Sequence, residues 1–242
     1  MLRVLVTGAA RGLGLGLVEA FRARGDEVVA VCRQPSPELE QLGAEVAAGI
    51  DLAERDATER LEAALSGAPL DVVVCNAGVN LTFADTIDDL RLDLVEYELQ
   101  VNTLGVVRTV KAALPLLHHG SKILLITTQP AGIGPQAVDG GIYGYRLSKA
   151  AMTTFGYVLA LDLRPRGIAV RMVDPGPVAT HILRSVAAAG FTTLDPERAP
   201  APLTVARDLL ERIDELTLET TGQWVKRRGG LLMVPEPATT SD

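Results

Sequence analysis

Residues 2–14 read Leu2-Arg3-Val4-Leu5-Val6-Thr7-Gly8-Ala9-Ala10-Arg11-Gly12-Leu13-Gly14. The first half is a short apolar run, which is typical of a buried parallel strand, and the glycines follow where that run ends. Glycine lets the backbone turn tightly and approach a phosphate group, which the amides at the start of the next helix can bind. This segment therefore predicts a strand, a glycine-rich turn and a helix that together bind a dinucleotide.

Similar apolar runs recur along the chain and alternate with helical patterns. We expect strands at residues 2–7, 27–32, 44–48, 72–75, 122–127 and 168–173, and helices at 13–24, 54–65, 88–117, 146–163 and 202–216. Because parallel strands need long crossover connections, this alternation predicts an α/β fold with a doubly wound parallel sheet of about seven strands and helices on both faces. We expect one Rossmann-type domain over residues 1–234, a substrate lid at about 181–203, and a flexible C-terminal tail at 235–242.

The composition excludes several classes of partner. The 242 residues include 48% hydrophobic residues and carry a formal net charge of -7, whereas a nucleic-acid binder needs a concentrated basic surface. The short basic run Lys226-Arg227-Arg228 is interpreted as a solvated turn. No apolar run reaches the length of a bilayer and no signal peptide is recognised, so we expect a cytoplasmic protein without membrane contact. Cys32 and Cys75 end apolar runs and are predicted to be buried thiols in a reducing compartment; no metal site is predicted.

Five further elements follow the glycine-rich turn along the chain. The spacing Gly-x-x-x-Gly-x-Gly after Thr7 resembles the fingerprint of the short-chain dehydrogenase/reductase family. Asp51-Leu52 resembles the adenine-contacting pair of that family, and Cys75-Asn76-Ala77-Gly78 resembles its Asn-Asn-Ala-Gly element, with Cys in place of the first Asn. Asn102, Asp174-Pro175-Gly176 and Thr180 follow in family order. The resemblance covers about residues 2–225 and implies an oxidoreductase with a nicotinamide cofactor.

The charge near the second strand indicates which cofactor. An NAD site offers a carboxylate to the ribose 2′-hydroxyl, whereas a 2′-phosphate needs Arg or Lys. Here the strand at 27–32 is followed by Arg33, and Arg11 precedes the second glycine. Either arginine alone also fits an ordinary surface residue, but the two together predict NADP(H). The resemblance implies that the cofactor is bound by Gly8, Arg11, Gly12, Leu13, Gly14, Arg33, Asp51, Leu52, Asn76, Ala77, Gly78, Tyr145, Lys149, Pro175, Gly176, Val178 and Thr180.

Tyr145 and Lys149 are the central catalytic candidates. They lie four residues apart on a predicted helix and so share one face. A neighbouring ammonium lowers the pKa of a tyrosine, which is ordinarily about 10. The resemblance implies that Tyr145 is the general acid in carbonyl reduction or the base in alcohol oxidation, and that Lys149 lowers its pKa and holds the nicotinamide ribose. The competing interpretation is an exposed helix pair. Tyr143 is a poorer candidate, since Leu147 lies four residues after it.

Two further side chains complete the predicted catalytic set. The family has a serine at the end of its fifth strand that binds the substrate oxygen, and aligning Gly132 with the family glycine puts Thr128 in its place. Threonine keeps the hydroxyl and adds a methyl group that narrows the pocket; the alternative is two ordinary strand threonines. Asn102 lies inside a predicted helix, where Asn is disfavoured, so we expect a local kink. The resemblance implies that Asn102 holds a water that passes protons to the lysine.

The substrate is less well specified. The interval 128–145 contains Ile133, Pro135 and Val138, and the predicted lid contains Leu183, Val186, Phe191 and Leu194, with Arg184 and Arg198 as its basic residues. These apolar side chains favour a hydrophobic or weakly polar ketone, aldehyde or alcohol, although they also fit simple packing on the domain.

Around Tyr145 and Arg33 the sequence looks most like C-factor proteins and sniffer-type carbonyl reductases. That resemblance implies an NADPH-dependent carbonyl reductase, and it also leaves open a cofactor-binding signalling protein with little turnover. Family members commonly pair through the helices predicted at 88–117 and 146–163, so we expect a homodimer or homotetramer. Met152, Phe155 and Val158 fit either such an interface or the domain core.

Overall fold

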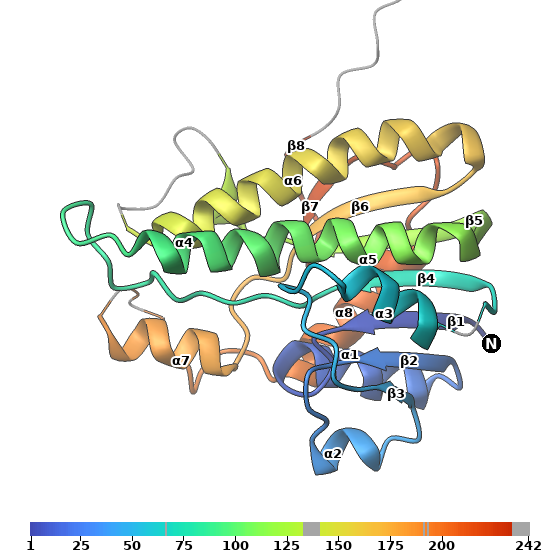
Figure 1. Cartoon of the computed structure of the whole chain (residues 1–242), viewed down its shortest axis with the longest axis horizontal. Helices are drawn as coiled ribbons and strands as arrows, with labels where there is room; N and C mark the ends of the chain where they lie inside the picture. Colours follow the sequence, from blue (N-terminus) through green and yellow to red (C-terminus); the bar gives the residue numbers. More distant parts are fainter. Residues whose placement is uncertain (66, 133–140, 191, 193, 234–242) are drawn as a thin grey trace, which may run out of the picture.

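A single sheet of eight strands, in the order β3-β2-β1-β4-β5-β6-β7-β8, organises the computed structural model, which describes residues 1–65, 67–132, 141–190, 192 and 194–233 (Figure 1). All neighbouring strands are parallel except β7 and β8. The strands are β1 (Arg3–Thr7), β2 (Glu27–Val31), β3 (Glu45–Ala47), β4 (Leu70–Cys75), β5 (Leu117–Ile126), β6 (Ala169–Asp174), β7 (Trp224–Lys226) and β8 (Leu231–Met233).

Helices cover both faces of the sheet, as Figure 1 shows. They are α1 (Gly12–Ala23), α2 (Pro37–Glu40), α3 (Ala57–Ala64), α4 (Leu92–Leu99), α5 (Gly105–Ala113), α6 (Tyr143–Leu163), α7 (His181–Ala188) and α8 (Pro202–Asp214). Strand side chains alternate between two apolar clusters: Leu5 packs with residues of α3, α5 and α6, whereas Val4 and Val6 pack with residues of α1 and α8. The α/β fold with a doubly wound sheet is therefore confirmed.

The topology fixes where a ligand can bind. From β1 the chain builds β2 and β3 on one side, then crosses over to place β4 against the other edge of β1. The connections that leave β1 and β4 at their carboxyl ends therefore run to opposite sides, and in such sheets the resulting crevice is where ligands bind.

The six predicted strands correspond to β1 to β6, whereas β7 and the edge strand β8 were not predicted. Each of them has only three residues, which is too short for a hydrophobic pattern to identify. The predicted helix at 88–117 was also wrong in part. It contains α4, a π-helical turn (Gln100–Leu104), α5 and a 3₁₀ turn (Leu114–Leu116), and residue 117 already begins β5.

The interpretation of the basic run as a solvated turn was wrong for Arg227. Its side chain is buried, and Nη1 donates a hydrogen bond to Asp208 Oδ2 of α8 at 2.6 Å. Lys226 and Arg228 are exposed. The predicted flexible tail, 235–242, lies outside the described residues. In the part of the chain that the structure describes, none of the helices has the length and apolar character needed to cross a bilayer.

Met152, Phe155 and Val158 of α6 fitted either a subunit interface or the domain core, and they differ in burial. Met152 is fully buried in the core and Phe155 packs against it, whereas Val158 is 49% exposed. Met152 therefore belongs to the domain core, whereas Phe155 is partly exposed and Val158 is the most exposed of the three.

Candidate active site

The glycine-rich turn lies at the carboxyl end of β1, and its glycines are required by close packing. Gly8 has a φ of 67°, and a Cβ there would lie 2.8 Å from the Cα of Ala77. A Cβ on Gly14 would collide with the carbonyl oxygen of Gly8. The turn therefore presses against the segment that follows β4, which brings Gly8, Gly14 and Ala77 together as predicted.

The first turn of α1 has features that favour binding of an anion. Arg11 occupies its N-cap position without a side-chain capping bond, and the first turn, which includes Leu13, contains no acidic residue. The first amides of a helix lack intrahelical partners and carry a partial positive charge, so they can bind a phosphate group. This geometry fits the pyrophosphate of a dinucleotide.

Thr7 joins the glycine turn to the Asn-Ala-Gly segment, a role that sequence reasoning did not assign. Its Oγ1 accepts hydrogen bonds from the amides of Asn76 at 3.1 Å and Ala77 at 3.2 Å, and Asn76 Nδ2 donates to the Thr7 carbonyl oxygen at 2.9 Å. A fully buried threonine at the end of an apolar strand was the signal that could have identified it.

Asn102 lies in the π-helical turn, which interrupts the α-helical hydrogen-bond pattern; the expected kink stays a prediction. Its side chain is fully buried: Oδ1 accepts from the amide of Val79 at 2.8 Å, while Nδ2 donates to the carbonyl oxygen of Val79 at 2.8 Å and to Ser148 Oγ at 2.9 Å. A Cβ on Gly78 would lie 3.2 Å from Asn102 Oδ1 and 3.3 Å from Lys149 Nζ. Asn102 and Lys149 thus meet at Gly78, and Asn102 also holds the loop after β4. Its role with a bound water stays a prediction.

Tyr145 and Lys149 share one face of α6, as their spacing predicted. Lys149 Nζ lies 5.9 Å from the centroid of the Tyr145 ring and donates a hydrogen bond to the carbonyl oxygen of Ile126 at 2.8 Å. Lys149 is 3% exposed, and this burial lowers its pKa to about 8. A lysine with this pKa is still largely cationic at neutral pH.

The predicted effect of Lys149 on the pKa of Tyr145 stays a prediction. Burial raises the pKa of the Tyr145 phenol well above its usual value, the negative charge of Asp174 raises it further, and a hydrogen bond with Thr128 acts in the opposite direction. Desolvation disfavours the charged phenolate, and it is the largest of these effects. Tyr145 is therefore held in its protonated form.

The two threonines that follow β5, Thr127 and Thr128, have different surroundings. Thr127 is buried, and its Oγ1 shares a hydrogen bond of 2.8 Å with Thr153 Oγ1 of α6. Thr128 is only partly buried and forms the hydrogen bond with Tyr145 named above. The structure thus brings Thr128, and not Thr127, to the tyrosine, in agreement with the alignment of Gly132.

Arg33 lies at the carboxyl end of β2 beside the predicted adenine-contacting pair. Its side chain is 57% exposed; Nη1 lies 3.5 Å from Asp51 Oδ2 and donates to the Tyr97 hydroxyl at 3.3 Å. Leu52 is buried, and its carbonyl oxygen accepts from Arg108 Nη1 at 2.8 Å. Arg33 and Asp51 therefore meet as predicted, although the carboxylate also neutralises part of the charge that a 2′-phosphate would need.

The segment after β6 returns to the glycine turn. Gly176 has a φ of 66° and its amide donates to Asp174 Oδ1 at 3.0 Å, while burial raises the pKa of Asp174. Pro175 and the buried Val178 lie in the same connection. Thr180 forms the N-cap of α7, and a Cβ on Gly12 would lie 3.2 Å from its Cγ2. Residues far apart in the sequence, Gly12 and Thr180, thus lie side by side.

The predicted lid contains α7, which has no buried residue. Its two basic residues are each paired with an acidic one: Arg184 Nε with Glu197 at 3.4 Å, and Arg198 Nε with Asp195 at 3.4 Å. They therefore offer little free positive charge to a substrate. The predicted pocket residues Ile133, Pro135, Val138 and Phe191 lie outside the described residues.

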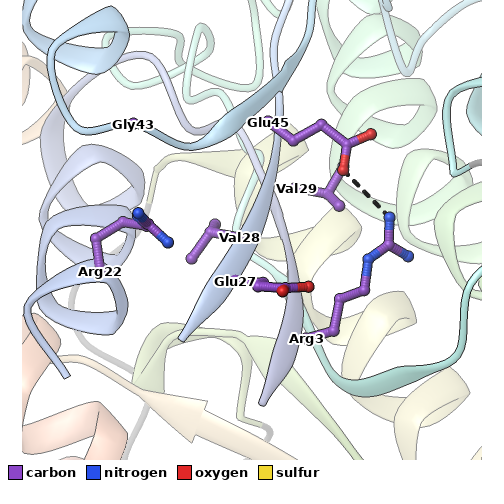
Figure 2. Close-up of a pocket in the computed structure, with 7 residues that line it drawn as sticks. All are labelled: Arg3, Arg22, Glu27, Val28, Val29, Gly43 and Glu45. Atoms are coloured by element: carbon purple, nitrogen blue, oxygen red, sulfur yellow. Dashed lines mark hydrogen bonds and ion pairs between the residues drawn. The ribbon is translucent and has the colours of Figure 1, made fainter. Parts of the chain in front are cut away.

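A cavity of about 200 Å³ lies at the other end of the sheet, where β1, β2 and β3 begin (Figure 2). Arg3, Glu27 and Glu45 line it, and Arg3 Nη2 lies 3.2 Å from Glu45 Oε2. None of the residues assigned from the sequence lies there. Among the described residues, no group of three or more His, Cys, Asp or Glu side chains is arranged to hold a metal ion.

Comparison with known proteins agrees with this geometry. A model of the short chain dehydrogenase family matches residues 3–189. The 1-hydroxy-2-glutathionyl-2-methyl-3-butene dehydrogenase of Rhodococcus sp. (strain AD45) is 34% identical over 234 residues, which cover 96% of this chain and 99% of that protein. The C-signal protein of Myxococcus xanthus is 32% identical over 163 residues, which cover 66% of this chain and 90% of that protein.

Among solved structures, the carbonyl reductase Sniffer of D. melanogaster superposes with a TM-score of 0.81 at 26% identity and covers 96% of this chain and 99% of that one. The family model extends from β1 into α7, and the Rhodococcus relative matches over nearly the full length. The chain belongs to the short-chain dehydrogenase/reductase family of oxidoreductases, and within it the C-factor and sniffer-type carbonyl reductases are its relatives.

Proposed function

We propose that this protein is an NADP(H)-dependent oxidoreductase that transfers a hydride between the nicotinamide and the carbonyl carbon of a ketone or aldehyde, or the corresponding alcohol. The observation that supports this most directly is the convergence of Tyr145, Lys149 and Thr128 beside the glycine turn, at the carboxyl ends of the central strands. An acid, a buried cation and a second hydroxyl next to a dinucleotide crevice are the groups that this chemistry requires.

The proposed mechanism assigns each side chain one task. When bound, the nicotinamide supplies or accepts the hydride. Thr128 donates a hydrogen bond to the carbonyl oxygen of the substrate, and Tyr145 donates its proton to that oxygen as negative charge develops there. Since burial keeps Tyr145 protonated, it is ready to act as the acid in reduction. In alcohol oxidation the phenolate form of Tyr145 acts as the base and accepts the proton of the alcohol.

Lys149 and Asn102 support the proton transfer. The Lys149 ammonium holds the nicotinamide ribose and stabilises the phenolate that remains after Tyr145 has given up its proton. Asn102 lies next to Lys149 at Gly78, and we assign it the water that returns a proton from solvent.

The cofactor cradle is assigned in three parts. The start of α1, with Gly8, Arg11, Gly12, Leu13 and Gly14, binds the pyrophosphate. Arg33 and Arg11 bind the 2′-phosphate, while Asp51 and Leu52 contact the adenine. The nicotinamide half is held by Asn76, Ala77, Gly78, Tyr145, Lys149, Pro175, Gly176, Val178 and Thr180.

We propose a weakly polar substrate, because the basic residues of the lid are neutralised by Glu197 and Asp195. Ile182 and Leu194, both partly exposed, supply apolar surface in the lid region. We also propose a homodimer or homotetramer, since Leu104, Val158 and Leu161 expose apolar surface on the helices through which family members pair.

A second function, cofactor binding for signalling with little turnover, is favoured by one observation: the likeness to the C-signal protein. The complete set of Thr128, Tyr145 and Lys149 favours turnover instead, since a binding protein has no need of the acid.

The test is a panel of ketones, aldehydes and alcohols assayed with NADPH, NADP⁺, NADH and NAD⁺, together with fluorescence titration of both reduced cofactors. Tyr145→Phe should lower kcat about 10³-fold, because it removes the acid, and should leave NADPH affinity nearly unchanged. Tyr143→Phe, a neighbouring tyrosine on the same helix, is the matched control. Wild-type turnover by Tyr145→Phe would overturn the mechanism, and tight NADPH binding without turnover on any substrate would favour the signalling function.

The same titrations test the cofactor assignment. Arg33→Ala should weaken NADPH binding about tenfold or more and change NADH binding little, because only NADPH carries the phosphate. Equal weakening of both cofactors would contradict the preference for NADP(H).

A further inference from the structure

Glu98, in the last turn of α4, is a fully buried carboxylate close to the catalytic helix. Oε1 accepts hydrogen bonds from the amides of Leu81 and Thr82, the second at 3.2 Å, and Oε2 accepts from the Thr82 hydroxyl at 2.8 Å. Burying a carboxylate is costly unless such donors satisfy it. These three donors satisfy the carboxylate at its buried position.

Thr82, also fully buried, passes this interaction on to α6. Its Oγ1 accepts a hydrogen bond from the amide of Gly144 at 3.1 Å while its own proton goes to Glu98. A hydroxyl can donate and accept at the same time, so the directions of the two bonds are consistent. The result is a chain of hydrogen bonds from Glu98 through Thr82 to the first turn of α6.

The first turn of α6 has no cap of its own. The residue at its N-cap position, Ile142, has a φ of 48° and makes no side-chain capping bond. The amide of Gly144 is one of the first four of the helix, which have no intrahelical partner. Thr82 supplies the missing acceptor from a different part of the chain, and the negative charge of Glu98 stabilises the positive end of the helix dipole.

The packing around Gly144 leaves no space for a side chain at this position of α6. A Cβ on Gly144 would collide with Glu98 Oε2 and would lie 3.0 Å from the Cα of Val95. The residue that follows Gly144 is Tyr145. A displacement of Glu98 or Thr82 would therefore move the backbone that carries the tyrosine.

We propose that Glu98 is a positioning residue that acts through Thr82 and the amide of Gly144 to fix Tyr145 in its reactive place. This role rests on the proposed function, in which Tyr145 is the acid or base. Sequence motifs give no indication of it, because the three residues come from α4, a loop and α6.

Glu98 also contributes to the electrostatics of the phenol. Burial has the largest effect and raises the pKa of Tyr145; the charges of Asp174 on β6 and Glu98 on α4 raise it further, and the hydrogen bond with Thr128 lowers it. Lys149, on the same helix, is the cation near the ring, at 5.9 Å. Removing the charge of Glu98 should therefore shift the pKa of Tyr145 to lower pH.

The first experiment separates an effect on the position of Tyr145 from an effect on cofactor binding. Thr82→Val keeps the shape of the side chain and removes the hydroxyl, so kcat should fall about tenfold while KM for the cofactor stays within about twofold. Thr82→Ser should restore most of kcat. Thr109→Val is the matched control, because Thr109 is an equally buried threonine whose hydroxyl bonds only within α5, to the Gly105 carbonyl oxygen at 2.8 Å, and its loss should leave kcat unchanged.

The second experiment is the pH profile of Glu98→Gln. Reduction needs the protonated phenol, so its rate falls as pH rises through the pKa of Tyr145, and in the variant this fall should occur at lower pH. Alcohol oxidation needs the phenolate, and its rise should likewise move to lower pH. A merely structural role for Glu98 would lower the rate at every pH without moving the profile.

Hydrogen–deuterium exchange of the peptide that covers Ile142 to Ser148 gives a readout without turnover. Exchange in this peptide should be faster in Thr82→Val than in the wild type and in Thr109→Val. Wild-type kcat and wild-type exchange in Thr82→Val would overturn the positioning role. A different pair of results would separate the two proposals. If exchange is faster in Thr82→Val but Tyr145→Phe keeps full turnover, the hydrogen-bond chain is supported and the proposed function is overturned.

Discussion

Charged side chains at the amino ends and at the carboxyl ends of the strands have different interaction partners. At the amino ends of the strands, ionised groups pair with each other: Arg3 with Glu45 at 3.2 Å, and Arg24 with Asp26 at 2.6 Å and with Asp214 at 3.0 Å. Opposite charges at these distances neutralise one another. The cavity at this end is lined by such residues (Figure 2), and its charges contribute to the fold.

At the carboxyl ends, the buried Lys149 and Asp174 and the partly buried Tyr145 hydrogen-bond with neutral or backbone groups instead. Lys149 donates to a carbonyl oxygen, Asp174 accepts from an amide, and Tyr145 hydrogen-bonds with Thr128. Burial raises the pKa of Tyr145 and Asp174 and lowers that of Lys149, so it favours the neutral form of each group. Perturbed groups of this kind gather at functional sites. Burial also lowers the pKa of Lys122 and Arg171 near the amino ends. The candidate active site is therefore distinguished by perturbed groups that lie together, Tyr145 beside Lys149 and within the influence of Asp174.

The largest effect should come from Lys149→Met. We expect kcat to fall about 10²-fold or more, because the cation beside Tyr145 is lost. We also expect the free energy of unfolding to rise by about 2 kcal/mol at neutral pH, since the cost of burying the ammonium exceeds the value of its hydrogen bond to Ile126. Enzyme assays and denaturant titrations measure the two effects.

The pH dependence of this stabilisation checks its cause. The folded pKa of Lys149, about 8, lies below its usual value of 10.5, so the unfolded chain binds more protons between these values. The gain of Lys149→Met over the wild type should be complete below about pH 8 and should vanish as pH approaches about 10.5. If Lys149→Met is less stable than the wild type at every pH, the Lys149 ammonium stabilises the fold, as the paired charges at the amino ends do.

A smaller effect should separate the two adjacent threonines. Thr128→Val should lower kcat/KM about tenfold or more with little change in stability, because its hydroxyl faces Tyr145. Thr127→Val should lower the free energy of unfolding by about 1 kcal/mol through loss of the bond to Thr153, with nearly normal activity. The reverse result would mean that Thr127 binds the substrate oxygen.

How much could be predicted from the sequence depends on how far apart the interacting residues lie. The glycine turn and the pair Tyr145 and Lys149 follow from local spacing, and the structure places them as expected. Thr128 could be preferred over Thr127 by alignment with one glycine. Such features carry their information within a few residues.

What could not be predicted depends on the tertiary structure. Glu98, Thr82 and Gly144 come together only when α4, the loop after β4 and α6 are packed, and no periodicity indicates this. Arg227 seemed solvated because its partner Asp208 lies on α8. The burial that raises the pKa of Tyr145 could not be foreseen, because the motif shows only the neighbouring ammonium.

The smallest effect on activity should come from Arg3 at the amino ends. Arg3 Nη1 donates to the Ala68 carbonyl oxygen at 3.0 Å, and its side chain is mostly buried, whereas its partner Glu45 is half exposed. Arg3→Ala should therefore lower the free energy of unfolding by about 1 kcal/mol through the unsatisfied carbonyl group, while Glu45→Gln should have almost no effect. Because the charges at this end neutralise one another and lie away from the crevice, kcat and NADPH affinity should equal those of the wild type in both variants. Thermal unfolding and cofactor titration measure these quantities, and weaker NADPH binding in Arg3→Ala would mean that the amino ends also take part in function.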